Sequence, residues 1–103
     1  MITALVQFRL QNPLTPEQAR KAFAGSAPHY REIPGLIRKY YILKDDGKVA
    51  GGLYLWRTRA AAERLYDEDW RRTVTALYGA EPSVTFFETP VVVDNQAGQI
   101  IMD

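Results

Sequence analysis

The sequence predicts an α+β fold in which helices cover one face of an antiparallel sheet. Three observations support this prediction. Apolar residues alternate along several short segments, as they do in half-buried strands. Helix-capping residues precede the segments with helical spacing, and an Asp-Gly turn joins two of the strands. The expected order along the chain is β-α-β-β-α-α-β.

The first strand and the first helix have separate signals. Residues 2–10, ITALVQFRL, alternate in the manner of a half-buried strand. Thr15 and Pro16 are of the types favoured at the N-cap and the first position of a helix. Pro28 is expected to kink that helix, because its ring clashes with the preceding turn. Residues 33–35, IPG, end the helical region.

Two strands joined by a tight turn follow. Residues 36–44, LIRKYYILK, form the second strand, and residues 45–48, DDGK, are a hairpin signal that leads into the third, VAGGLYLW at 49–56. Both faces of the second strand carry large apolar or amphipathic groups. One expected face holds Leu36, Arg38, Tyr40 and Ile42, and the other holds Ile37, Lys39, Tyr41 and Leu43.

Two further helices are expected, over residues 59–66 and 68–78. Thr58 can cap the first and Asp67 the second, which should end at Gly79, since glycine is favoured just after a helix.

The chain ends in a strand and a short tail. Residues 81–95 predict a fourth strand that can break at Pro90, and residues 96–103 contain a turn at Gly98 before a short apolar run. This order of elements is that of the ferredoxin-like, split βαβ pattern.

Composition limits the possible functions. The 103 residues fit one domain, and the 13 basic residues are interleaved with 12 acidic ones, so neither a nucleic acid nor a membrane surface is expected as a partner. The chain has no cysteine, which excludes disulfides, cysteine-ligated zinc and a cysteine nucleophile. We find no signal-peptide pattern and no apolar run of membrane-spanning length, and expect a cytoplasmic protein.

The third strand raises the question of what covers its two faces. Tyr54 and Trp56 fall on one face, Leu53 and Leu55 on the other. The helices can cover only one side, and the other would leave a larger apolar patch than monomers usually tolerate. We therefore expect an isologous homodimer packed sheet to sheet, with the tail, residues 94–103, reaching across to the partner. The pattern does not decide which face holds Trp56.

Several segments resemble the monooxygenases of the YdhR family, part of the wider dimeric α/β-barrel superfamily. These are IPGLIRKYY, GGLYLW, RTRAAAE and AEPSVTFFETPVVVDN, and the resemblance spans roughly residues 2–95. Its most specific parts are Pro34-Gly35 and Gly51-Gly52. The resemblance implies a dimeric barrel that oxidises an aromatic or polyketide-like molecule with O₂ and without a cofactor.

Other functions stay open, because similar barrels include isomerases, cyclases and haem-degrading enzymes. A non-catalytic protein that binds a hydrophobic metabolite is a further alternative. Haem is disfavoured, since haem-degrading relatives place a histidine on the helix after the third strand and residues 68–78 contain none. A metal site is not expected from one histidine and no cysteine.

Three residues are candidates for proton transfer. His29 is the only histidine, and an imidazole can exchange a proton near neutral pH. The alternative is that it is a solvated residue beside the helix kink. Tyr41 and Tyr54 are the other two candidates.

The remaining candidates would bind the substrate. A cluster of Tyr and Trp side chains makes an apolar pocket with a few hydrogen-bonding points, which suits a planar organic ligand. The alternative is that these aromatics are simply core. Arg38, like its neighbour Lys39, could stabilise an enolate or phenolate inside a barrel, or could extend to the strand edge. The expected substrate-binding residues are Tyr30, Trp56, Tyr66, Trp70 and Arg38.

Overall fold

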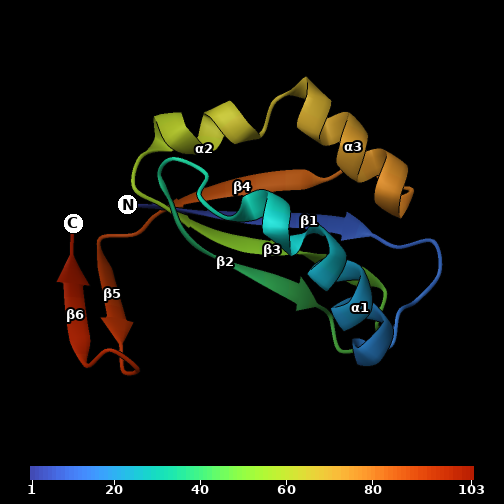
Figure 1. Cartoon of the computed structure of the whole chain (residues 1–103), viewed down its shortest axis with the longest axis horizontal. Coiled ribbons are helices and arrows are strands. Elements are labelled where there is room, and N and C mark those ends of the chain that lie inside the picture. The colour runs from blue at the N-terminus through green and yellow to red at the C-terminus, as the bar shows by residue number, and fades with distance from the viewer.

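The computed structural model describes residues 1–103 as a four-stranded antiparallel sheet, helices on one of its faces, and a separate hairpin (Figure 1). The strand order is β2-β3-β1-β4, so β1 and β3 are central. This confirms the predicted ferredoxin-like α+β fold. The strands of the sheet are β1 (Ile2–Arg9), β2 (Leu36–Leu43), β3 (Val49–Trp56) and β4 (Ser83–Glu88).

The first helical region changes geometry near its end. It runs as the α-helix α1 (Pro16–Ser26) and continues as the 3₁₀ helix η1 (Ala27–Tyr30). The backbone N–H of Gln18 donates to the Thr15 side chain, and the backbone N–H of Thr15 donates to the Gln18 side chain, forming a capping box. Pro28 lacks the N–H that a further α-helical turn would need, which explains the change at this point.

The other two helices are α2 (Arg59–Leu65) and α3 (Glu68–Tyr78). Both begin where their capping residues predict, and α3 also ends at Gly79 as predicted, while α2 ends one residue before its predicted end. The side chain of Thr58 accepts a hydrogen bond from the backbone N–H of Ala61, and that of Asp67 accepts one from the backbone N–H of Trp70. Gly79 ends α3 in the left-handed conformation, with φ of 76°.

The chain after β4 forms a hairpin that projects beyond the end of the sheet (Figure 1). Its strands are β5 (Val91–Asp94) and β6 (Gln99–Met102). The predicted fourth strand therefore divides at Pro90, as expected. Arg38 and Asp94, 3.1 Å apart, link β2 to the hairpin.

The core lies between the sheet and the helices. Tyr54 and Trp56 face the helices, and Trp56 is fully buried. A register shift between Leu36 and Arg38 pairs Leu36 with Trp56, so Leu36 packs on the core instead of sharing the face of Arg38, as its spacing had predicted. No helix covers the opposite face. None of the helices has the length and apolar character needed to cross a membrane.

Candidate functional site

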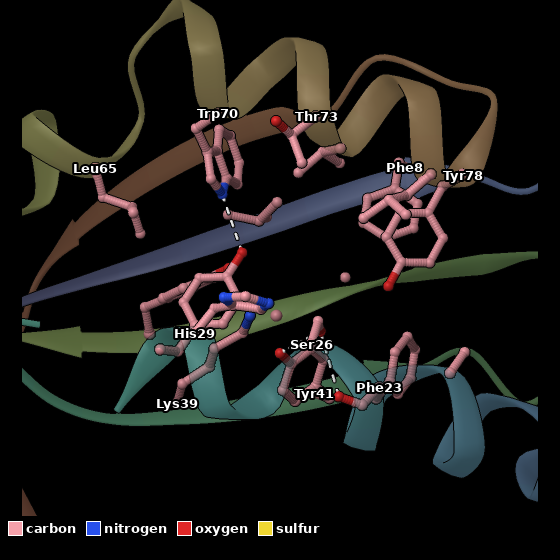
Figure 2. A pocket seen from close by; sticks show the side chains of 18 of the residues that line it. Phe8, Phe23, Ser26, His29, Lys39, Tyr41, Leu65, Trp70, Thr73 and Tyr78 are labelled. Atoms are coloured by element: carbon pink, nitrogen blue, oxygen red, sulfur yellow. Dashed lines mark hydrogen bonds between the residues drawn. The ribbon is translucent and has the colours of Figure 1, made fainter. Parts of the chain in front are cut away.

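A cavity of about 650 Å³ lies between the sheet and the helices (Figure 2). Its floor comes from β1, β3 and β2, while α1 with η1 and α3 form opposite walls. Most of its lining residues are apolar or aromatic. Pockets for small organic molecules have this composition and typically enclose roughly 300–1,000 Å³.

Two glycines open the floor of the cavity. Gly52 lies between Val6 of β1 and Tyr41 of β2 in the sheet register. A Cβ atom on Gly52 would lie 2.7 Å from a ring carbon of Tyr54 and 3.1 Å from the side chain of Lys39. A Cβ atom on Gly51 would lie 1.8 Å from the carbonyl oxygen of Val6. The glycine pair thus allows a close approach inside the sheet and leaves room above it.

Hydrogen bonds fix two of the aromatic rings in the cavity wall. The indole N–H of Trp70 donates to the hydroxyl of Tyr30 at 3.1 Å, which links α3 to η1. The hydroxyls of Ser26 and Tyr41 lie 2.7 Å apart and link α1 to β2 (Figure 2). These contacts set the ring positions on both sides of the cavity.

Lys39 is the only lysine or arginine that lines the cavity. Its Nζ lies 3.2 Å from the ring centroid of Tyr30, 3.8 Å from that of Tyr41 and 4.6 Å from that of Tyr54. No aspartate or glutamate is among the lining residues. Burial lowers the pKa of Lys39 to about 7. The three ring faces attract its ammonium form.

Three tyrosines of the cavity are held as neutral phenols. Burial raises the pKa of Tyr41, Tyr54 and Tyr78 above the ordinary value, and the nearby Tyr30 adds to the effect. Their hydroxyls can donate hydrogen bonds at neutral pH, but phenolate bases are disfavoured. The structure brings no three His, Asp or Glu side chains together in a cluster that could hold a metal ion.

The structure places five of the eight predicted site residues around the cavity. These five are His29, Tyr30, Tyr41, Tyr54 and Trp70.

The other three predicted residues lie elsewhere. Trp56 and Tyr66 are buried behind the cavity, where the indole N–H of Trp56 donates to the Tyr66 hydroxyl at 3.1 Å. Arg38 lies on the opposite face of the sheet and donates to Asp94 and to the hydroxyl of Tyr40. A ligand in this cavity would not contact these three side chains.

Lys39 lines the cavity, although the sequence indicates it only beside Arg38 and places only Arg38 of the two among the expected substrate-binding residues. It pairs directly with Tyr54 across β2 and β3, and it shares a face with Tyr41. The usable signal was the alternation of β2, in which Arg38 and Lys39 must point to opposite faces. Choosing between them required knowing which face meets the helices.

Comparison with known families gives one match over most of the chain. The family model described as "Putative mono-oxygenase ydhR" matches residues 4–88, which include the four-stranded sheet almost entirely and all of the helices. No curated protein matches the chain significantly.

Solved structures of similar fold include two oxygenases and a third protein described as a putative monooxygenase. A monooxygenase from Streptomyces coelicolor, the product of ActVA-Orf6, in complex with nanaomycin D, is 20% identical with a TM-score of 0.66, over 85% of this chain and 86% of that one. SnoaB from Streptomyces nogalater, a cofactor-independent oxygenase, is 20% identical with a TM-score of 0.62, over 85% and 91%. A protein from Deinococcus radiodurans described as a "putative antibiotic biosynthesis monooxygenase" is 14% identical with a TM-score of 0.66, over 91% and 97%.

Proposed function

Since this chain belongs to the ydhR mono-oxygenase family, we propose that it oxidises an aromatic or polyketide-like small molecule with O₂ and without an added cofactor. The observation that carries the proposal is the aromatic-lined cavity of about 650 Å³ between the helices and the sheet. The fold neighbours add support, because one was solved with nanaomycin D and another is a cofactor-independent oxygenase.

The proposed reaction uses the substrate itself as the electron donor. An acidic C–H or phenol group loses a proton, and the resulting anion passes one electron to O₂. The two radicals combine to a peroxide anion on carbon. This anion takes back a proton to give a hydroperoxide, which loses water to leave a carbonyl group. A ring CH₂ and O₂ thus give C=O and H₂O, with one oxygen atom in each product. The protein orients the substrate, excludes water and moves protons.

We assign the proton-transfer roles to residues that line the cavity. His29 is the candidate acceptor of the C–H proton, because imidazole can take a proton near neutral pH. Tyr41 and Tyr54, as neutral phenols, are candidate donors of hydrogen bonds to developing negative charge. Tyr30 and Trp70, which hold each other through a hydrogen bond, are proposed as walls for a planar substrate.

A homodimer is part of the same proposal. The face of the sheet opposite the helices carries Leu53, Leu55 and Tyr40, the last 51% exposed. The neighbouring hairpin has five exposed apolar side chains, those of Val91, Val93, Ile100, Ile101 and Met102. A second copy packed on this face, with the hairpin reaching across, would bury both surfaces.

Oxidation of a defined probe tests the function. We expect the protein to accelerate O₂ uptake by dithranol, a dihydroxyanthrone, and to place one atom from oxygen-18 gas in the carbonyl product. Thr73→Trp, which fills the cavity from α3, should abolish the acceleration over the protein-free rate. Ala76→Trp, exposed on the same helix but outside the cavity lining, should not. A ligand that stays unchanged in air would indicate a binding protein, and equal conversion without O₂ a cyclase or isomerase.

Two substitutions test the proton-transfer roles. We expect His29→Ala and Tyr54→Phe each to lower kcat by about 10²-fold, the lower end of what general acid–base groups contribute. Both should leave the melting temperature within a few degrees of the wild type. If both variants keep wild-type turnover, these two roles are wrongly assigned.

A further inference from the structure

We propose that Lys39 is the anion-binding residue of the cavity: its amine takes the proton of an acidic hydroxyl on the bound molecule, and the ammonium then holds the phenolate or enolate oxygen. This inference rests on the proposed function, because it concerns the same cavity. It narrows the substrate class to planar aromatics that present an ionisable hydroxyl to Lys39.

The ammonium group of Lys39 has no counter-ion in the cavity. Lys39 makes no hydrogen bond or ion pair through its side chain, and no carboxylate lines the cavity. Its contacts are the faces of Tyr30, Tyr41 and Tyr54, which attract a cation but supply no carboxylate-like acceptor. A half-buried ammonium in apolar surroundings favours an anionic partner, and a ligand oxygen is the one that the cavity leaves room for.

The surrounding residues hold the Lys39 amine in place. Gly52 leaves the space that the stem of Lys39 passes through, since a Cβ there would lie 3.1 Å from Lys39 Cε. The Tyr30 ring is fixed by Trp70, and the Tyr41 ring by Ser26. A cation fixed by its surroundings before the ligand binds stabilises negative charge without reorganisation.

The proton step involves no oxidation. The O–H bond of the ligand breaks and an N–H bond forms on Lys39, which converts two neutral groups into an ion pair. Burial, which lowers the pKa of Lys39 to about 7, leaves part of the amine unprotonated near neutral pH. The titratable side chains that line the cavity with Lys39 are His29 and Tyr30 from η1, Tyr41 from β2, Tyr54 from β3 and Tyr78 from α3. None of them is a carboxylic acid.

A pair of dyes tests the proposal without requiring turnover. Alizarin is a hydroxylated anthraquinone whose visible absorbance shifts when its hydroxyl ionises, and anthraquinone lacks that hydroxyl. We expect the wild type to bind alizarin as the anion at a pH where free alizarin is neutral. Lys39→Met should abolish the spectral shift and weaken alizarin binding by about tenfold or more, while anthraquinone binding changes less than about twofold. Lys48→Met, an exposed control, should match the wild type.

A second measurement uses the unmodified protein. Alizarin should protect Lys39, and not Lys48, from trinitrobenzenesulfonate at neutral pH, as read by peptide mass spectrometry. An unprotected Lys39, a wild type that binds both dyes equally or binds neither, or a Lys39→Met variant that keeps the alizarin shift would overturn the proposal. The proposed function can fail separately. If the wild type ionises alizarin through Lys39 but never consumes O₂ with dithranol, the role of Lys39 is supported and the oxygenase function is contradicted.

Discussion

Lys39 combines burial, three aromatic contacts and the absence of a counter-ion in one residue, and this combination has a consequence for stability. Burial lowers its pKa from 10.5 to about 7. Between these two values the unfolded chain therefore binds more protons than the folded chain, and stability rises with pH. The penalty for keeping Lys39 in the cavity is largest below pH about 7 and has vanished above pH about 10.5.

This sign can be measured in a narrow pH window. We expect the melting temperature of the wild type to rise relative to that of Lys39→Met between pH 6.5 and 9.5, because the variant lacks the titrating amine. The window stops there because buried tyrosines such as Tyr54, with raised pKa, destabilise the fold once tyrosines ionise in the unfolded chain. Scanning calorimetry of both proteins and of the control Lys48→Met gives the comparison. Parallel curves for wild type and Lys39→Met would show that Lys39 keeps its ordinary pKa.

For individual site residues, the sequence indicated the right residue types but not the face of the sheet on which each lies. Tyr30, Tyr41, Tyr54 and Trp70 line one cavity, as the aromatic content suggested. The sequence pattern does not distinguish Arg38 from Lys39, because both faces of β2 carry large apolar groups. Local alternation therefore could not say which cation meets the helices, since that depends on the packing of the whole sheet.

Among the elements, β3 shows most clearly how sequence and packing interact. The glycine pair within it allows a close backbone approach, because a Cβ atom on Gly51 would overlap the carbonyl oxygen of Val6. The first residues of the helices followed from the N-cap residues Thr15, Thr58 and Asp67, because these caps depend only on local hydrogen bonds. The irregularity between Leu36 and Arg38 was not predicted, because pairing with β3 decides it.

Two glycine substitutions should have opposite effects. Gly51→Ala should lower the free energy of unfolding by about 1–3 kcal/mol, because the new methyl group would overlap the carbonyl oxygen of Val6 in the central pair of strands. Gly25→Ala should raise it by about 0.5–1 kcal/mol, since Gly25 lies in α1 and a Cβ there meets nothing within 4 Å. Urea unfolding of the three proteins measures both changes. A neutral Gly51→Ala would mean that the sheet relaxes around the methyl group.

The whole molecule has one covered and one uncovered sheet face. On the uncovered side, Phe87 is 50% exposed and Tyr40 51%, and the hairpin adds Val93, Ile100 and Met102 at 64%, 70% and 75%. Burying such side chains is favourable at roughly 25 cal/mol per Å² of apolar surface. The prediction of a partner chain follows from the fold together with these exposures.

Leu53→Glu tests the homodimer at the centre of the uncovered face. Leu53 pairs with Leu5 of β1 and Tyr40 of β2, so a carboxylate there would be buried without a partner in each of two packed copies. We expect native mass spectrometry to find a wild-type dimer at micromolar concentration, and the substitution to raise its dissociation constant by about a hundredfold or more. Ala24→Glu adds the same charge to an exposed position of α1 and should leave the dimer intact. A wild-type monomer under these conditions would show that the uncovered face does not bind a second copy of this chain. This result would not affect the function proposed for the cavity on the helix side.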